Sequence, residues 1–252
     1  MRLRPIALSC ALTGTLGFLA LPAAPAVAES TASVHAVATV KPPISVSFPV
    51  TDNPYGAQVT ITVTLGPTFT SRKVSLYATP VGQPRRLVAA GTVDADGKWY
   101  PVYSITRTTT FTAVFAGDAR DAPNSASRTL RAYARVTDRI GGYYKTSRSS
   151  SGTVYDVFHS ADALTLYSTV APNKHGECLE PETQQYDAGA GWDADTKYGC
   201  DKLDGKSHDA APFSLSRAGG DRYRIRGDYF RGSSDTANLN GQGPWLYFIV
   251  TK

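Results

Sequence analysis

The most distinctive stretch for chemistry is Arg222-Tyr-Arg224-Ile-Arg226, in which three arginines occupy alternate positions. Alternate residues of a β-strand share one face, so the three guanidinium groups would line up while the intervening residues point into a core. Such a row suits bidentate recognition of carboxylate or phosphate groups. We therefore take the three arginines as candidate ligand-binding residues. The alternative is that they pair with the acidic stretch between residues 177 and 209.

Four aromatic residues join this candidate set. Trp192, Tyr143, Tyr144 and Phe230 fall in expected turns or out of phase with core positions. Their rings could stack on sugar rings, although packing in a core or hinge is the commoner role. Residues 226–228 spell the adhesion tripeptide Arg-Gly-Asp, but we expect it to lie within a strand.

The first 28 residues have the pattern of a secretory signal peptide. Arg2 and Arg4 precede an apolar stretch, and small residues lead to an Ala26-Val-Ala28 cleavage site. Cys10 lies too close to the start for a lipid anchor. The mature chain is expected to begin near Glu29, and no later stretch is long and apolar enough for a membrane span.

Cleavage leaves two cysteines, Cys178 and Cys200, which predict one disulfide in an exported chain. The alternative is a thiol nucleophile, because His175 lies three residues before Cys178. No third orienting residue accompanies that pair. The disulfide is the preferred interpretation, and closing its loop should stabilise the fold by about 3 kcal/mol.

Other catalytic or metal-binding patterns are weak. There is no Gly-x-Ser-x-Gly motif, and the four histidines are scattered without ligand spacing. Asp193 and Asp195 could form a calcium loop or a pair of glycosidase carboxylates, but their spacing fits no EF-hand. Whether an ion binds near Asp118 and Asp121 stays open. We expect no enzyme activity, no metal and no cofactor.

The net charge of +5 over 252 residues is too mild to indicate nucleic-acid binding. A basic surface outside the cell suits acidic envelope polymers. The expected partner is therefore a surface polysaccharide or other envelope polymer, or a secreted protein.

Short alternating stretches such as 44–48, 59–65 and 74–76, joined by Gly, Pro, Asn and Asp, predict an antiparallel β-sandwich. The plan recurs in the second half. Phe115 matches Tyr229 at an offset of 114 residues, and this register continues without gaps to Tyr133 and Tyr247. Residues 96–98 match 204–206, and 59–65 match 164–170. We predict a domain at 29–136 and a second at 137–252, which carries the disulfide.

The stretch Thr110-Phe-Thr-Ala-Val-Phe115-Ala-Gly117-Asp118 and the strand 130–136 resemble bacterial immunoglobulin-like repeats of secreted and surface proteins. The resemblance covers residues 36–136 and is more distant over 143–252, where Arg231-Gly232 replaces Gly-Asp. It implies tandem immunoglobulin-like sandwiches that serve as spacer, adhesive or binding modules. It implies no catalytic residue.

The sequence therefore favours a secreted, extracellular or cell-wall-associated binding module whose second domain carries the site. Two alternatives remain. One is a structural spacer or assembly subunit that makes its contacts through sheet edges. The other is a small hydrolase or inhibitor built on the second domain, supported only by the acidic stretch.

Overall fold

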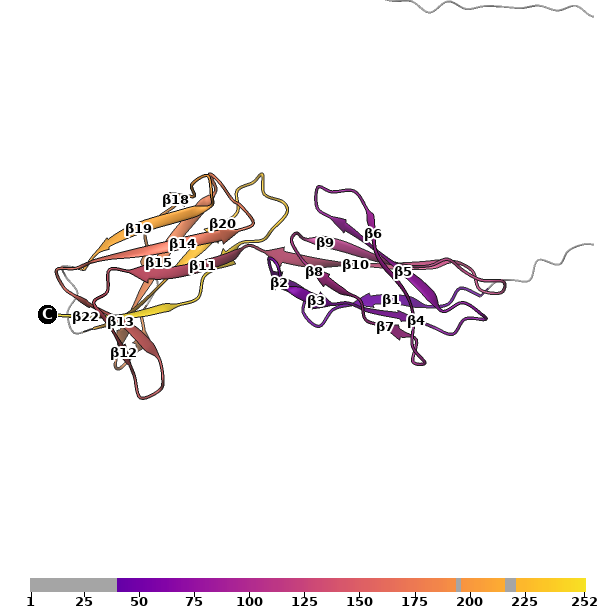
Figure 1. Ribbon diagram of the computed structural model, residues 1–252, viewed down its shortest axis with the longest axis horizontal. Helices are drawn as coiled ribbons and strands as arrows, with labels where there is room; N and C mark the ends of the chain where they lie inside the picture. Colours follow the sequence, from indigo (N-terminus) through magenta and orange to yellow (C-terminus); the bar gives the residue numbers. More distant parts are fainter. Residues whose placement is uncertain (1–39, 194–195, 216–220) are drawn as a thin grey trace, which may run out of the picture. The chain divides into compact units, whose positions relative to one another are not determined.

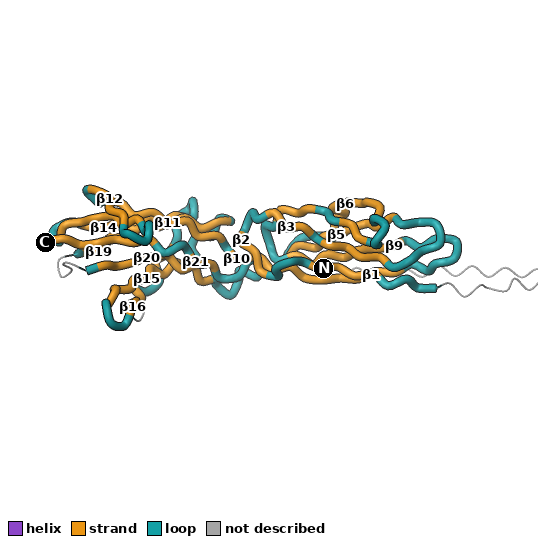
Figure 2. The backbone as a smooth tube through the Cα atoms, turned by 90° about the horizontal axis from the view of Figure 1, so that it is seen from below, coloured by secondary structure: helices purple, strands orange, loops and turns teal. Residues whose placement is uncertain are grey.

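The computed structural model describes residues 40–193, 196–215 and 221–252. The described residues form β-strands and no helix, as Figure 2 shows, so the all-β prediction is confirmed. The predicted signal peptide, residues 1–28, lies outside the described residues.

The strands of residues 44–133 form what we call the N-terminal sandwich (Figure 1). Its three-stranded sheet has the order β1-β4-β7, its five-stranded sheet has the order β2-β10-β9-β5-β6, and β3 pairs with β8. The bounds are β1 (Ile44–Ser47), β2 (Asp52–Pro54), β3 (Gln58–Thr60), β4 (Thr62–Leu65), β5 (Lys73–Pro80), β6 (Arg86–Thr92), β7 (Lys98–Trp99), β8 (Val102–Ser104), β9 (Thr109–Phe115) and β10 (Asn124–Tyr133).

The strands of residues 135–251 form the C-terminal sandwich. One sheet has the order β11-β14-β19 and the other β12-β13-β22-β20-β15-β16, with short strands paired to β15 and β20. The bounds are β11 (Arg135–Gly141), β12 (Lys145–Arg148), β13 (Val154–His159), β14 (Ala163–Ala171), β15 (Cys178–Asp187), β16 (Gly191–Trp192), β17 (Thr196–Lys197), β18 (Asp201–Lys202), β19 (His208–Ser214), β20 (Arg222–Phe230), β21 (Gly241–Gln242) and β22 (Leu246–Thr251).

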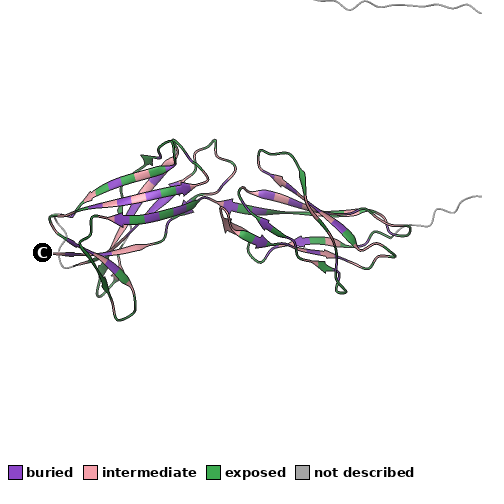
Figure 3. Cartoon of the chain, in the orientation of Figure 1, coloured by how far each residue is buried: buried purple, intermediate pink, exposed green. Residues whose placement is uncertain are grey.

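Alternation of apolar and polar residues explains the two faces of each strand. In β9 every second side chain is buried, from Thr109 to Phe115, and Figure 3 shows the same alternation along other strands.

Both sandwiches also share an immunoglobulin-like arrangement. A strand near the start pairs in parallel with the last one, β2 with β10 and β13 with β22, whereas the other pairs of named strands are antiparallel.

Two turns with the same hydrogen bonds show which residues of the two sandwiches are equivalent. Asp94 Oδ1 accepts hydrogen bonds from the N–H groups of residues 96 and 98, and Asp204 Oδ1 does so from those of residues 206 and 208. Leu65 N–H donates to the carbonyl of Gly97, as Val170 N–H does to that of Ser207. The turns thus equate Asp204 with Asp94, so the predicted match of 96–98 with 204–206 is wrong by two residues. The match of 59–65 with 164–170 agrees with these bonds.

The ungapped repeat also fails in the closing strand. Thr109 lies opposite Leu130 in the first sandwich, so an offset of 114 would place Pro244 opposite Tyr223. Tyr223 instead lies opposite Phe248. The second copy has accommodated extra residues before β22, a change that composition and spacing alone did not reveal.

The Gly117-Asp118 signature acts as a turn. The Asp118 carboxylate accepts hydrogen bonds from four backbone N–H groups, those of Thr70, Ser71, Arg120 and Asp121. These bonds hold the pKa of Asp118 well below its usual value. Both Asp118 oxygens thus accept backbone hydrogen bonds, and we assign them a structural role.

The cores of the two sandwiches differ. The first has one cluster of buried apolar residues, whereas the second has two, separated by what we call the polar row: Asp138, Ser168 and Asp209. These three residues pair across β11, β14 and β19. The equivalent row in the first sandwich is Val46, Val63 and Trp99.

Burial raises the pKa of Asp138 to about 6, although the Gly227 N–H donates to Asp138 Oδ2 at 2.8 Å and opposes the shift. Asp138 Oδ1 and Asp209 Oδ2 are buried and make no hydrogen bond within the described chain. A side chain at position 227 would begin 2.9 Å from Ser168 Oγ. Glycine at this position therefore leaves room for the polar row.

A buried ion pair lies elsewhere in the C-terminal sandwich. Lys174 Nζ is 2.5 Å from Asp235 Oδ2, and both side chains are less than a tenth exposed. Lys174 also donates to Asn238 Oδ1, and the Tyr229 hydroxyl donates to Asp235 Oδ2. Burial opposes ionisation of Asp235, but these bonds outweigh it and lower its pKa.

Strand β10 ends at Tyr133 and β11 begins at Arg135. The predicted division into domains at residues 136 and 137 stays a prediction.

Candidate functional site

The three arginines lie on β20, on the face opposite the core, as the alternating pattern predicts. Between them, Ile225 is fully buried and Tyr223 stacks on Phe248 with ring centroids 5.2 Å apart. The side chains of β20 therefore divide between the core and the outer face of the larger sheet.

Arg224 is held between two tryptophan rings. Its guanidinium carbon lies 4.5 Å from the Trp192 centroid and 4.3 Å from that of Trp245. Arg226 lies 4.3 Å from the same Trp245 ring. These distances are within the range of cation–π attraction, which contributes roughly 0.5–2 kcal/mol according to exposure.

Arg222 extends the arrangement, because its guanidinium carbon lies 6.0 Å from the Tyr155 centroid and 5.8 Å from that of Tyr186. The rings also contact one another, with Trp192 5.3 Å from Tyr186 and 5.7 Å from Tyr247. We call this set the Arg–aromatic platform; its members are Arg222, Arg224, Arg226, Tyr155, Tyr186, Trp192, Trp245 and Tyr247.

The charges on the platform are partly neutralised. Arg226 Nη2 is 2.9 Å from Glu182 Oε2, and its Nε is 3.1 Å from Asp228 Oδ1. Glu182 and Asp228 are both buried. Arg224 donates to Gln184. The alternative of pairing within the sandwich therefore applies to Arg226, whereas Arg222 is exposed and Arg224 is bonded to a neutral amide.

Three predicted site residues lie away from the platform. Tyr143 packs edge-on against Phe158, and Tyr144 stacks on His159 at 4.0 Å. Phe230 lies at the opposite end of β20 from Arg222, with Lys197 5.6 Å from its ring. Their contacts with neighbouring strands account for these rings, so we leave them out of the site.

Sequence reasoning missed Trp245, Tyr247, Tyr155 and Tyr186. Tyr247 lies directly opposite Arg224 in the sheet. Only the pairing of β22 with β20 places it there, and the ungapped repeat gave a different register. The alternation of Tyr247 with Phe248 was the one available signal that the former points outward.

The predicted disulfide between Cys178 and Cys200 is confirmed. Because Cys178 is bonded, it is not available as the thiol nucleophile considered beside His175. The Arg-Gly-Asp tripeptide lies in β20 with Asp228 buried, as expected for a strand.

The acidic candidates do not converge on a metal centre. Asp193 is exposed, and Asp195 lies outside the described residues. Across the parts of the chain that the structure describes, no group of three or more His, Cys, Asp or Glu side chains is arranged to hold a metal ion. None of these described segments contains a helix long and apolar enough to cross a membrane.

No protein-family model matches the chain, and no curated protein matches it either. Solved structures similar to it include a tetra-tandem repeat in the extending region of a large adhesion protein, with 15% identity and a TM-score of 0.31, covering 81% of this chain and 49% of that one. The D0-D1 domain of intimin has 15% identity and a TM-score of 0.28, covering 81% of this chain and 97% of that one. The BSP domain of a biofilm-associated protein has 11% identity and a TM-score of 0.24, covering 83% and 29%. This chain thus spans about half of the first structure and under a third of the last.

Proposed function

We propose that the chain is an exported, non-enzymatic binding module that holds an anionic polymer of the cell envelope on the Arg–aromatic platform. The observation that supports this is the position of Arg224 between Trp192 and Trp245, beside the exposed Arg222. Guanidinium groups bind carboxylates and phosphates in a bidentate manner. Aromatic faces stack on sugar rings, and Trp192 and Trp245 are partly exposed. Together they suit a charged polysaccharide.

The platform members have different roles in this proposal. Arg226 is neutralised by Glu182 and Asp228, so it orients Trp245 instead of contacting the polymer. Arg222 and Arg224 make the contacts with acidic groups. Trp192 supplies a ring face and restricts Arg224, which lowers the entropy lost on binding.

The test is co-sedimentation of residues 29–252 with purified cell walls of the producing organism. Soluble polygalacturonate and neutral dextran serve as defined probes. We expect binding to walls and to polygalacturonate, weakening with salt, and little binding to dextran. Arg224→Ala should weaken binding at least tenfold, and Trp192→Ala several-fold.

Arg139→Ala is the matched control, because Arg139 lies 3.8 Å from the Tyr167 ring centroid on the other sheet of the same sandwich. It should bind like the unmodified chain. Equal binding by folded Arg224→Ala and Trp192→Ala variants would contradict the site. Capture of one defined secreted protein, without polymer binding, would favour the assembly-subunit alternative.

A further inference from the structure

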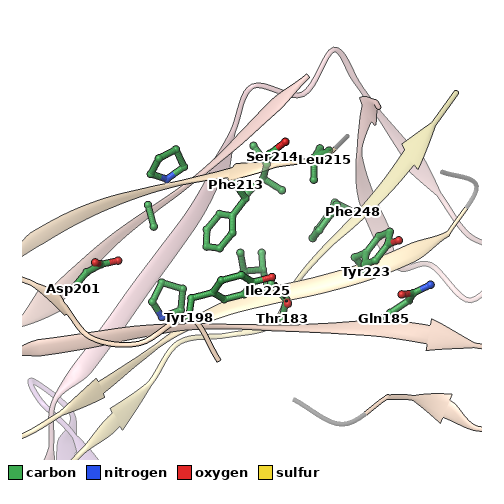
Figure 4. A pocket seen from close by; sticks show the side chains of 14 residues that line it. Thr183, Gln185, Tyr198, Asp201, Phe213, Ser214, Leu215, Tyr223, Ile225 and Phe248 are labelled. Atoms are coloured by element: carbon green, nitrogen blue, oxygen red, sulfur yellow. Dashed lines mark hydrogen bonds between the residues drawn. The ribbon is translucent and has the colours of Figure 1, made fainter. Parts of the chain in front are cut away.

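The C-terminal sandwich contains a cavity of about 500 Å³ between its two sheets. It lies between the edge strand β19 and strands β15 and β20 of the facing sheet. Figure 4 shows Phe213, Ile225, Tyr223 and Phe248 around this space. Ile225 and Phe248 belong to a buried apolar cluster of this sandwich, so the floor of the cavity is apolar.

Aromatic rings form the walls of the cavity. The Tyr198 and Phe213 centroids are 4.8 Å apart in an edge-to-face contact, and Tyr223 stacks on Phe248. Tyr198 is half exposed, and its hydroxyl lies 3.1 Å from Thr183 Oγ1. Tyr198 therefore forms a wall that solvent also reaches.

Polar groups occupy the rim. Thr183, Gln185 and Asp201 line the cavity, and the last two are exposed. Asp201 is the one charged side chain among the described lining residues, which include no Lys, Arg or His. The rim therefore favours hydrogen-bond donors and cations over anions.

The equivalent position in the N-terminal sandwich is filled. Ala78 and Phe111 face each other across β5 and β9, as Thr183 and Ile225 do across β15 and β20. Phe111 is fully buried and packs edge-on against Tyr103 at 4.9 Å. An Ile side chain fills less of the core than a Phe ring does, so more space remains at this position in the second sandwich.

We infer that this cavity binds a small molecule with an apolar, ring-sized body and a hydrogen-bond-donating head, preferably an amine. Its volume is within the range of ligand pockets, and such pockets combine apolar walls with a few polar groups. The body lies against Phe213, Tyr223 and Phe248, and the head faces Asp201. The platform is on the outer face of the same sheet, so this site is independent of the proposed polymer binding.

The test is a titration of residues 29–252 with tryptamine, indole and indole-3-acetate, followed by calorimetry and by NMR of the Leu and Ile methyl groups. We expect tryptamine to bind most tightly and indole-3-acetate at least tenfold more weakly. Ile225→Phe, which copies Phe111, should reduce tryptamine binding at least tenfold because the larger ring fills the cavity.

Asp201→Asn is a second variant, and its exposed position leaves the core unchanged. Asp201→Asn should weaken tryptamine binding at least fivefold and indole binding less than twofold. Asp96→Asn on the N-terminal sandwich should change the binding of neither compound. Arg224→Ala should also leave tryptamine binding unchanged, which separates this site from the platform. Absence of saturable binding at millimolar tryptamine, or binding unaffected by both Ile225→Phe and Asp201→Asn, would overturn the inference.

Discussion

The two sandwiches share the order of their main strands, but the space between their sheets is filled differently. In the N-terminal sandwich one apolar cluster extends across the interior, with Val46 and Val63 paired at its centre. In the C-terminal sandwich Asp138 and Ser168 occupy the equivalent pair and separate two smaller clusters. Replacement of apolar by polar groups in a core costs free energy unless their hydrogen bonds are satisfied.

The C-terminal sandwich also contains features that can compensate. The disulfide joins Cys178 at the start of β15 to Cys200, and the Lys174–Asp235 pair connects two loops in the interior. The candidate ligand sites, the platform and the cavity, lie in this same sandwich. The first sandwich therefore has one continuous apolar cluster, whereas the second combines two smaller clusters with a covalent and an ionic link.

The largest expected effect comes from breaking the buried ion pair. Lys174→Met leaves the Asp235 carboxylate buried with one fewer partner, which should cost about 3–5 kcal/mol of unfolding free energy. This loss of unfolding free energy is measured by denaturant unfolding, with hydrogen exchange of C-terminal peptides as the readout. Lys206→Met, at an exposed position, is the control and should cost under about 0.5 kcal/mol. Equal stability of the two variants would mean that the pair does not hold the loops.

The disulfide should contribute the next largest effect. Replacing Cys178 and Cys200 together by Ser removes a link across 22 residues and should destabilise the C-terminal sandwich by about 3 kcal/mol. Peptides from β4 and β9 should keep their exchange protection. Loss of protection in both sandwiches together would show that they unfold as one unit and would remove this part of the comparison.

The polar row gives a prediction of opposite sign. The pKa of Asp138 is raised, so the folded state binds an extra proton between about pH 4 and pH 6, and stability falls as the pH rises through this range. Asp138→Asn removes the buried charge and should stabilise the chain by about 2 kcal/mol at pH 7.5, with little effect at pH 4. Urea unfolding at both pH values measures it. Destabilisation at pH 7.5 would show that the Asp138 charge is satisfied, with Arg226 as the nearby cation.

The smallest effect sharpens the comparison of the two ion pairs. Arg131 and Asp52 of the N-terminal sandwich are also 2.5 Å apart, but their side chains are 53% and 41% exposed. Arg131→Ala should therefore cost under about 1 kcal/mol, because water screens the exposed pair. Thermal unfolding of Arg131→Ala and of Lys174→Met compares two ion pairs that have the same N···O distance but differ in burial. A cost as large as that of Lys174→Met would refute burial as the cause.

Much of the fold could be predicted from local pattern. Alternation along residues 59–65 and 74–76 identified strands, and the cysteine count identified the disulfide. The row of Arg222, Arg224 and Arg226 was also predictable, because a strand has a period of two. Pairing was not. The turn register was wrong by two residues, and the closing strand was displaced, because an insertion shifts the pairing without disturbing the alternation on either side.

The composition and spacing of the chain determined its all-β class, its disulfide and the outward direction of the three arginines, because these depend on neighbours within a strand or on residue counts. The tertiary structure decided which residues meet. It placed Trp245 and Tyr247 beside Arg224, and it left a cavity where Ile225 stands in place of a larger ring. Contacts between strands depend on register and on the volume that facing side chains leave, and neither is a property of one strand alone.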